Sequence, residues 1–374
     1  MAKKSFVPNP AKIKVIGLGG GGCNAITRMV QEQIQGVEFI GVNTDAQALL
    51  LTEAPIRIQI GERLTRGLGV GGDHILGHKA AEESRDELRE CLRGADMVFI
   101  TVGLGGGTGT GSAPVVAELA REQQALTIAV VTKPFTFEGT HRHDVAEEGI
   151  EYLLDKVDTL IVIPNDRLLA LCDKNTAVTN AFKMADDVLR HAVQAIAEVI
   201  IVPGVINLDF ADVKAVMKDA GPAWMSIGRG TGQNRATDAA KAALASPLLD
   251  VSVSGAKGVL FNVCGGSSLS LFEVYEAAEV IGKAVDPDAN IIFGVVFDPK
   301  MDNEVKITLI ATGFTAATSR TVRKDEELRR LLQDAEMEHE LDVPTYLRNP
   351  QARRRVMEAP AFKQRSLNLQ STPS

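Results

Sequence analysis

The stretch Gly103-Leu104-Gly105-Gly106-Gly107-Thr108-Gly109-Thr110-Gly111-Ser112-Ala113-Pro114 decides the fold of this chain. It follows the short apolar run Met97–Val102, which predicts a buried strand, and precedes residues 115–123, whose apolar positions recur at helical spacing. Glycines let the backbone approach a ligand with its N–H groups turned inward, and the N-terminus of a following helix adds positive charge. We therefore expect an anion-binding loop rather than an ordinary glycine-rich turn, with Ser112 as the helix cap and Pro114 in the first turn.

The composition narrows the class of protein. With 374 residues, 45% of them hydrophobic, the chain has enough apolar material for two domains with large cores. Its 40 basic residues against 48 acidic ones give a net charge of −8, which argues against nucleic-acid binding. The four cysteines form no C-x-x-C pair, so neither a zinc site nor a disulfide framework is indicated. Because the sequence has no signal-peptide pattern and no spanning apolar run, we expect a cytoplasmic protein that meets membranes only indirectly.

A second unit of strand, glycine loop and helix lies near the N-terminus. The apolar run Ile13–Ile16 leads into Gly17-Leu18-Gly19-Gly20-Gly21-Gly22 and a helix through Ile34. The glycine spacing also satisfies G-x-G-x-x-G, with Asp45 at the distance of a ribose-binding residue, so an NAD-dependent dehydrogenase is one alternative. Two glycine loops at the carboxyl ends of parallel strands face one crevice, however, and two anion cradles suit a polyphosphate. The sequence has no G-x-x-x-x-G-K-[ST], so backbone amides would hold the phosphates.

Gly105-Gly106-Gly107-Thr108-Gly109-Thr110-Gly111, continued by Ser-Ala-Pro, resembles the nucleotide signature of the tubulin and FtsZ family. The resemblance to FtsZ, the tubulin-like GTPase of bacterial cell division, extends from about Ala11 to Phe314. It implies a GTP-hydrolysing protein that forms filaments with itself in the division ring at mid-cell. The implied ligands are GTP or GDP with Mg²⁺ near the phosphates, not held by direct protein ligation, and K⁺ is a further candidate. A nucleotide-binding scaffold with little hydrolysis is the alternative within the family.

The resemblance also implies which residues contact the nucleotide, and residue chemistry supports part of that assignment. A carboxylate at Asp186 matches the paired N1–H and N2–H donors of guanine and suits adenine poorly, which favours GTP over ATP. From the residues alone, Phe182 is an aromatic of the core, and Glu138 with Arg142 belongs to a solvated helix start; only the resemblance makes them nucleotide contacts. The loop Gly67–Asp73 resembles the family loop that responds to the γ-phosphate, or is a mobile connection. The implied nucleotide-binding residues are Gly20, Gly21, Gly22, Asn24, Asn43, Asp45, Gly106, Gly107, Thr108, Gly109, Thr110, Glu138, Arg142, Asn165, Phe182 and Asp186.

The stretch Asn207-Leu208-Asp209-Phe210-Ala211-Asp212 permits two interpretations. On spacing alone, Asp209 caps a helix that begins at Phe210, and Asp212 lies in its favourable first turn. The stretch also resembles the catalytic loop of FtsZ, which implies that Asn207, Asp209 and Asp212 act on the GTP of a neighbouring subunit. Acidic side chains can position the attacking water and a hydrated Mg²⁺. A head-to-tail contact of this kind does not close on itself and yields filaments.

The pattern of strands alternating with helices predicts an α/β chain with a Rossmann-like domain of the tubulin and FtsZ type. A long central helix, a smaller mixed α/β domain and a flexible C-terminal tail complete the prediction. Leu341 to Arg348 resembles the FtsZ peptide that binds membrane tethers and regulators, and the basic residues beyond it suggest a partner, an anionic membrane or a solvated tail. The predicted segments are 1–11 (flexible), 12–175 (GTP-binding), 176–202 (central helix), 203–316 (C-terminal domain with the catalytic loop), 317–340 (charged linker), 341–348 (partner-binding peptide) and 349–374 (basic tail).

Overall fold

The computed structural model describes residues 11–170, 172, 176–201, 209–249, 253–299 and 301–314. The chain divides into two compact units, Met1–Thr315 and Ala316–Ser374, and every described residue belongs to the first. The predictions for Asn207, for the peptide from Leu341 to Arg348 and for the basic tail lie outside the described residues.

In the described part of the chain, ten strands form one sheet in the order β3-β2-β1-β4-β5-β6-β7-β10-β8-β9. The first six run parallel and carry nearly continuous apolar sequences, as strands covered on both faces require. Their order is that of a doubly wound fold, and it reverses between β1 and β4, where such sheets bind ligands. The predicted Rossmann-like architecture is thereby confirmed. The parallel strands are β1 (Ile13–Leu18), β2 (Val37–Asn43), β3 (Ile56–Gln59), β4 (Met97–Gly103), β5 (Leu126–Lys133) and β6 (Thr159–Pro164).

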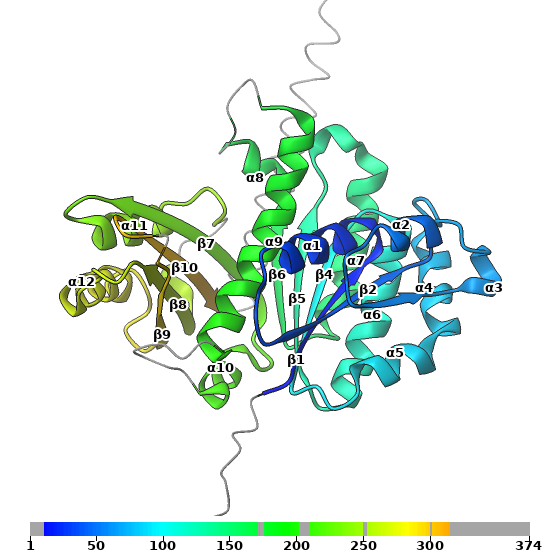
Figure 1. Ribbon diagram of the computed structural model, residues 1–374, viewed down its shortest axis with the longest axis horizontal. Coiled ribbons are helices and arrows are strands. Elements are labelled where there is room, and N and C mark those ends of the chain that lie inside the picture. The colour runs from blue at the N-terminus through cyan, green and yellow to red at the C-terminus, as the bar shows by residue number, and fades with distance from the viewer. Residues whose placement is uncertain are drawn as a thin grey trace, which may run out of the picture. The chain divides into compact units, whose positions relative to one another are not determined.

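Helices cover both faces of this parallel part (Figure 1). One face packs under α1 (Gly19–Gln31), α9 (Val178–Ile201) and α10 (Phe210–Met217). The other packs under α4 (His74–Glu83), α5 (Arg85–Leu92), α6 (Gly107–Glu122) and α7 (Thr140–Leu154). Short helical turns link these elements: α2 (Ala46–Leu50), α3 (Glu62–Thr65), η1 (Thr136–Glu138) and α8 (Asn165–Leu169).

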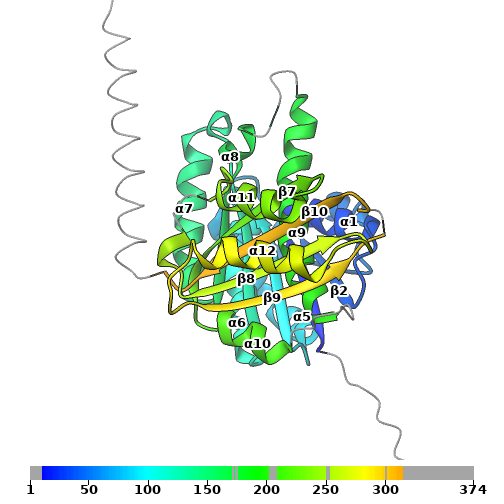
Figure 2. The same ribbon diagram turned by 90° about the vertical axis from the view of Figure 1, so that its left-hand side faces the viewer.

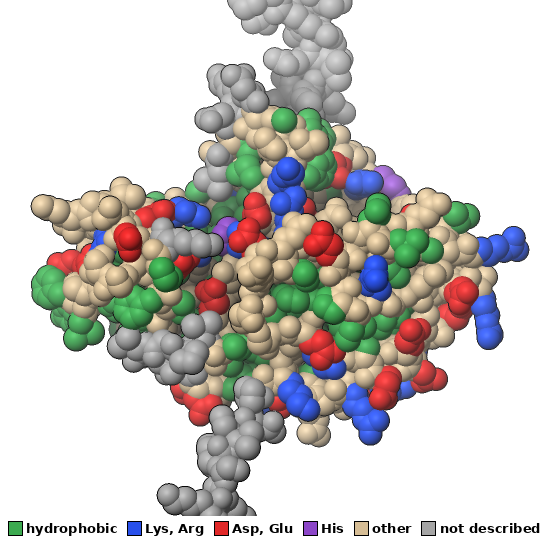
Figure 3. Space-filling model, viewed as in Figure 1, with side chains coloured by type: hydrophobic (Ala, Val, Ile, Leu, Met, Phe, Trp, Pro, Cys, Tyr) green, Lys and Arg blue, Asp and Glu red, His purple; other side chains and the backbone are tan. Residues whose placement is uncertain are grey.

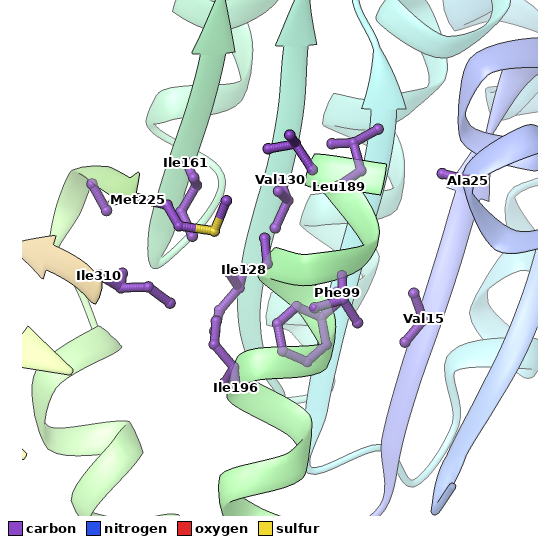
Figure 4. Close-up of a cluster of buried hydrophobic side chains, with 14 of the residues drawn as sticks. Val15, Ala25, Phe99, Ile128, Val130, Ile161, Leu189, Ile196, Met225 and Ile310 are labelled. Atoms are coloured by element: carbon purple, nitrogen blue, oxygen red, sulfur yellow. The ribbon is translucent and has the colours of Figure 1, made fainter. Parts of the chain in front are cut away.

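The central helix α9 is the element around which the larger core is built. Leu189 and Ile196 recur along its buried stripe and face Phe99, Ile128 and Val130 of β4 and β5 (Figure 4). Met225 and Ile310, from the second half of the chain, close the same cluster. Each such side chain stabilises the fold by about 1.5–3 kcal/mol on burial. The helix thus fixes the two halves of the unit to each other, as its apolar periodicity predicts.

Among the described residues, the second half adds four strands and two main helices, which Figure 2 shows turned toward the viewer. The first residues of β7 pair parallel with β6, and the rest of β7 pairs antiparallel with β10. The predicted strands near 258–263, 291–297 and 305–312 and the predicted helices near 235–245 and 271–285 are confirmed. These elements are β7 (Gly221–Thr231), α11 (Arg235–Leu244), η2 (Val253–Gly255), β8 (Gly258–Gly265), α12 (Leu271–Gly282), β9 (Asn290–Phe297) and β10 (Glu304–Thr312).

Strand β7 is absent from the sequence prediction because its glycines conceal the strand pattern. A Cβ atom on Gly228 would lie 2.0 Å from the carbonyl oxygen of Ala239, and one on Gly230 would lie 2.0 Å from that of Arg235. The glycines therefore let α11 approach the strand backbone closely, which isolated sequence patterns do not reveal. Among the described residues, no helix is both long and apolar enough to cross a membrane.

Candidate functional site

A cavity of about 420 Å³ lies beside the carboxyl ends of β1, β4 and β5, at the reversal of strand order. Its volume falls within the range of small-molecule sites. Residues from both glycine loops, from η1 and α7, and from α8 and α9 meet there. The predicted residues that line it are Gly20, Gly21, Asn24, Gly106, Gly107, Thr108, Gly109, Glu138, Arg142, Asn165, Phe182 and Asp186.

The two glycine loops touch each other and leave selected glycines open to the cavity. A Cβ atom on Gly19 would lie 2.9 Å from the backbone nitrogen of Gly109, so the loops pack backbone against backbone. A Cβ atom on Gly20 or Gly106 would meet nothing within 4 Å. Helices α1 and α6 begin in these loops, and their first N–H groups have no partners inside the helix. The arrangement is a preformed cradle for an anion.

The expected start of the second helix was wrong. Helix α6 begins at Gly107 rather than after Ser112, with Gly106 as its N-cap. Ser112 instead donates from Oγ to the Thr108 carbonyl oxygen at 2.7 Å, and Pro114 lies inside the helix. Tertiary packing overrides the low helix propensity of the glycines. A Cβ atom on Gly111 would lie 2.1 Å from the His74 carbonyl oxygen, so glycine is required where α6 meets α4.

Two threonines of the signature loop bond to the protein itself. Thr110 Oγ accepts from the backbone N–H of Gly105 at 3.0 Å, and Thr110 does not line the cavity. Thr108 lines the cavity, and its hydroxyl shares a hydrogen bond of 2.8 Å with that of Thr44. Both threonines are buried, so these bonds fix the conformation of the loop before any ligand arrives.

Three more of the predicted residues lie outside the cavity lining, namely Gly22, Asn43 and Asp45. A Cβ atom on Gly22 would be 2.5 Å from the Thr101 carbonyl oxygen, which makes this glycine a contact between α1 and β4. Asp45 caps α2 by accepting from two backbone N–H groups, and Asn43 Oδ1 accepts from the Asp45 N–H at 3.3 Å. In this structure these three residues therefore pack or bond within the protein itself.

Residues of α8 and α9 form another part of the cavity lining. Asn165 is buried, and its Oδ1 atom has no hydrogen-bond partner among the described residues. Phe182 is 40% exposed and meets Phe135 edge-on, with ring centroids 5.5 Å apart, so one ring face is available for stacking. An unpaired acceptor beside an accessible aromatic ring suits a planar ligand that carries N–H or O–H donors.

Asp186 is held by a partner that the sequence did not reveal. Its Oδ2 atom accepts from Arg28 Nε at 3.0 Å, and its side chain is only 16% exposed. Burial raises the pKa of Asp186, whereas Arg28 acts in the opposite direction. The arginine comes from α1, 158 residues earlier, and no spacing rule connects the two positions. The pair presents a mostly buried carboxylate at the cavity with its other oxygen still available.

Glu138 and Arg142 form an ion pair of 2.6 Å at the rim. The Glu138 carboxylate also accepts from the backbone N–H of Phe135 at 2.9 Å, which closes a capping box around η1. Arg142 remains more than half exposed, so its guanidinium is accessible to a ligand anion.

The loop Gly67–Asp73 is hydrogen-bonded to the anion cradle. Gly71 lines the cavity, and its carbonyl oxygen accepts from the backbone N–H of Gly107 at 2.8 Å. Asp73 caps α4 by accepting from the Leu76 N–H at 2.9 Å. A change at the cradle is therefore linked by hydrogen bonds to the start of α4. Further lining residues outside the predicted set are Leu18, Gly19, Gly103, Leu104, Thr132, Pro134 and Ala185.

Asp209 and Asp212 lie far from this cavity. Asp209 is the N-cap of α10, and Asp212 Oδ2 accepts from the Asp209 N–H at 3.3 Å, as spacing alone predicts. Both are exposed. Asp186 lies near the start of α9, and Ile201 at the other end is 15 positions further along the helix, about 22 Å along the axis. In Figure 1 α10 lies at the lower end of the unit, whereas α8 and the start of α9 lie at the upper end.

Figure 3 shows basic and acidic side chains interspersed among the described residues of one face. Acidic and basic side chains also pair with one another, as in the network in which Arg85 and Arg89 both contact Glu122. On the face that Figure 3 shows, positive charge is therefore not concentrated in one patch.

Comparisons with known proteins agree with this geometry. Residues 12–173 match the model of the Tubulin/FtsZ family, GTPase domain, and residues 221–315 match that of the FtsZ family, C-terminal domain. An empty FtsZ dimer from M. jannaschii is 48% identical, with a TM-score of 0.79 over 82% of this chain and 89% of that one. A tryptophan-to-tyrosine mutant of FtsZ from the same organism shows the same identity and TM-score, with 92% of its chain covered.

More distant structures share the fold. GDP-bound CetZ1 from Haloferax volcanii is 22% identical, with a TM-score of 0.72 over 87% of this chain and 99% of that one. The GTPγS-bound CetZ2 protofilament from the same organism is 20% identical, with a TM-score of 0.71 over the same shares. The 48% sequence identity over most of both chains shows which family the chain belongs to, and the glycine loop of α6 contains the nucleotide signature of that family. The chain belongs to the FtsZ family of polymerising tubulin-like GTPases.

Proposed function

We propose that adjacent subunits of this protein share one GTPase site, in head-to-tail filaments of the division ring at mid-cell in the cytoplasm. One observation carries the proposal: the nucleotide cavity and the carboxylates Asp209 and Asp212 lie at opposite ends of α9. They cannot meet within one chain. In a head-to-tail stack, the lower end of one subunit faces the cavity of the next, and the contact propagates without closing.

Within the cavity, the proposed nucleotide lies with its phosphates on the glycine cradle. The N–H groups near Gly20 and Gly106 would bind phosphate oxygens, and Arg142 would add a cation at the rim. The base would stack on Phe182, with its donors directed to Asp186 and to the unpaired Oδ1 of Asn165. A guanine presents N1–H and N2–H side by side, whereas adenine offers no such pair. This matching supports GTP as the substrate.

The carboxylates of the neighbouring subunit would orient the attacking water. Because Asp209 and Asp212 are exposed in one chain, they are accessible to an incoming subunit. Carboxylate and phosphate oxygen atoms are the ligands that Mg²⁺ prefers, and in such sites the ion keeps several of its own waters. A Mg²⁺ ion there would offset the negative charge of the phosphates. K⁺ near the phosphates remains part of the proposal for the same electrostatic reason.

Partners beyond the filament are proposed from sequence alone. We assign membrane tethers and division regulators to the peptide from Leu341 to Arg348, so that the membrane is contacted only through them. Deleting 341–348 should abolish recruitment to a tether-bearing membrane while leaving filament formation intact. Unchanged recruitment would remove this assignment.

The shared site is tested by a substitution that spares the helix cap. Asp212→Asn keeps an oxygen that accepts from the Asp209 N–H but removes the charge, and Asp209→Ser keeps an N-cap acceptor. We expect each variant to bind GTP with unchanged affinity and to lose at least about 100-fold in turnover, the scale of a lost catalytic group. An exposed charge elsewhere provides the control, Asp288→Asn on the loop before β9.

The assay is phosphate release from GTP and from ATP as a function of protein concentration, with light scattering on the same samples. Turnover per subunit should rise above a threshold together with scattering, and only with GTP. Turnover that is independent of concentration would place catalysis within one chain and refute the shared site. GTP-dependent scattering without turnover would support a scaffold that hydrolyses little.

A further inference from the structure

A second groove, of about 760 Å³, lies between α4, α6 and α7 and shares no lining residue with the nucleotide cavity. Two histidines of α4, His74 and His78, line it together with Glu148 of α7. Imidazole nitrogens and carboxylate oxygens are ligands that bind Zn²⁺ and similar divalent ions in proteins. The groove therefore contains a set of metal donors that the nucleotide site does not use.

The two histidines have the spacing of a helical chelate. They are four residues apart within α4, in the pattern His-x-x-x-His, so both side chains lie on one face of the helix. Zinc sites of the H-E-x-x-H type use the same spacing for two of their ligands. One ion can therefore be bound by both imidazoles.

Glu148 supplies a third donor from a different helix. Its Oε2 atom lies 3.2 Å from His74 Nε2. Two ligand atoms bound at about 2.0–2.1 Å to a tetrahedral ion lie roughly 3.3 Å apart, so these two atoms already have the separation that a shared ion requires. Two histidines and one glutamate are also the ligands of zinc sites that keep a fourth position for water.

Backbone packing on α6 fixes the distance between the two helices that carry the donors. A Cβ atom on Gly111 of α6 would lie 2.1 Å from the carbonyl oxygen of His74 and 2.5 Å from the backbone nitrogen of His78. A Cβ atom on Gly149 of α7 would lie 2.4 Å from Thr110 Cγ2. Because α4 and α7 both pack closely against adjacent residues of α6, the donor side chains project from a rigid frame.

The remaining charged groups of the groove favour a cation. Lys156 pairs with Glu118 of α6, so its charge is compensated. Glu151 lies one turn after Glu148 and lines the same groove, which adds a second carboxylate.

One donor has to turn for the site to form. Among the described residues, no group of three histidine, cysteine or carboxylate side chains is already placed to hold a metal ion. His78 is exposed, so its side chain can change rotamer without disturbing a core. The pair of His74 and Glu148 is thus the fixed part of the site, and His78 is the part that closes on the ion.

We propose that this protein binds one divalent ion of the Zn²⁺ class through His74 Nε2, the His78 imidazole and Glu148 Oε2, with water as the fourth ligand. The ion takes the place of the ion pair between His74 and Glu148 and joins α4 to α7. Helix α4 begins directly after the loop Gly67–Asp73, which is hydrogen-bonded to the anion cradle, so the ion would hold the start of this helix in place. This ion is separate from Mg²⁺ near the phosphates, and the proposal does not depend on the shared GTPase site.

The test titrates Co²⁺, which can replace Zn²⁺ and absorbs visible light, into the full-length chain, free of nucleotide and without a histidine tag. An ion bound by three protein ligands and water should give the intense absorption of tetrahedral Co²⁺, saturating at one ion per chain. Zn²⁺ should displace it. Excess Mg²⁺ should not, because Mg²⁺ prefers six oxygen ligands.

Two substitutions each remove one ligand. His78→Gln and Glu148→Gln should weaken Co²⁺ binding at least about 100-fold, because the loss of even an outer partner of a ligand costs about 10–100-fold. Both side chains are exposed, so the variants should fold, and thermal unfolding without metal checks this. The matched controls His141→Gln and Asp144→Asn change exposed residues of α7 outside the groove and should keep the affinity. Zn²⁺ should raise the unfolding temperature of the unchanged chain and the controls more than that of the two ligand variants.

Three results would overturn the proposal. A spectrum that remains that of octahedral Co²⁺ would show that no such site forms. Charge-transfer bands from sulfur to cobalt would place the ion on one of the four cysteines. Binding that is lost in His78→Gln but kept in Glu148→Gln would leave a histidine pair on α4 alone, with no link to α7.

Discussion

The ion pair between Arg28 and Asp186 offers a direct test of the proposal that Asp186 binds the guanine base. Replacing Arg28 by alanine leaves a carboxylate whose side chain is only 16% exposed without its cationic partner. Burial already raises the pKa of Asp186, and removing the guanidinium raises it further. A protonated carboxyl loses acceptor capacity, so it pairs poorly with two adjacent guanine donors. We therefore expect Arg28→Ala to weaken GTP binding even though Arg28 itself does not line the cavity.

The size of the effect follows from the partial burial of the pair. A hydrogen bond to a charged group contributes about 1.5–3 kcal/mol. The bond that GTP binding would lose is the one between guanine and the ionised Asp186, and because that carboxylate is not fully buried, about 2 kcal/mol is the appropriate part of that range. That free energy corresponds to roughly a 30-fold loss of GTP affinity. Arg28→Lys keeps a cation and should lose less.

The pH dependence has a definite sign. The carboxylate must be ionised to accept from guanine, so GTP affinity should fall as the pH falls through the pKa of Asp186. Since that pKa is higher without Arg28, the fall should begin at a higher pH in Arg28→Ala than in the unchanged protein.

Equilibrium binding of GTP and of inosine triphosphate, which lacks the 2-amino donor, measures the effect on selectivity. The unchanged protein should prefer GTP, and both Arg28→Ala and Asp186→Asn should reduce the preference. An unchanged GTP to inosine triphosphate ratio in both variants would refute the reading of guanine by Asp186. If Arg28→Ala kept its GTP affinity while Asp186→Asn lost it, the ion pair would not be what positions Asp186.

Two further predictions concern backbone packing at glycines and the titration of a buried histidine. Gly77→Ala should lower the free energy of unfolding by about 1–3 kcal/mol, because its Cβ would lie 2.2 Å from the Gly107 carbonyl oxygen. Gly106→Ala, whose Cβ meets nothing within 4 Å, should instead keep stability and weaken GTP binding. Denaturant titration and nucleotide binding separate the two, and equal stability would contradict the packing argument. Burial lowers the pKa of His191 to about 3, so the folded state binds fewer protons than the unfolded state below pH 6.5. Stability should therefore fall as the pH falls, by about 1.4 kcal/mol between pH 7.5 and 5.5, through this residue. His191→Gln should remove that component, and an unchanged pH dependence would exclude it.

Local sequence patterns were sufficient for the α/β class and for the position of the cradle. Apolar runs such as Met97–Val102 and the following glycines identify a strand and a close backbone approach without any knowledge of distant residues. The periodicity of α9 likewise predicts a long buried helix. These signals are strong because helix and strand periods, and the absence of a Cβ atom in glycine, act over a few residues.

Other features depend on contacts between distant segments. The sequence placed the start of the second helix at Ser112, but packing between α4 and α6 extends it back to Gly107. The Arg28 partner of Asp186 and the strand β7 were missed for the same reason. That the cavity and Asp209 lie at opposite ends of α9 also required the fold. Sequence by itself determined which elements form and which chemistry the loops carry, because those depend on neighbouring residues. Only the tertiary structure decided which groups meet, because such contacts depend on how α9 and the sheet bring together residues more than a hundred positions apart.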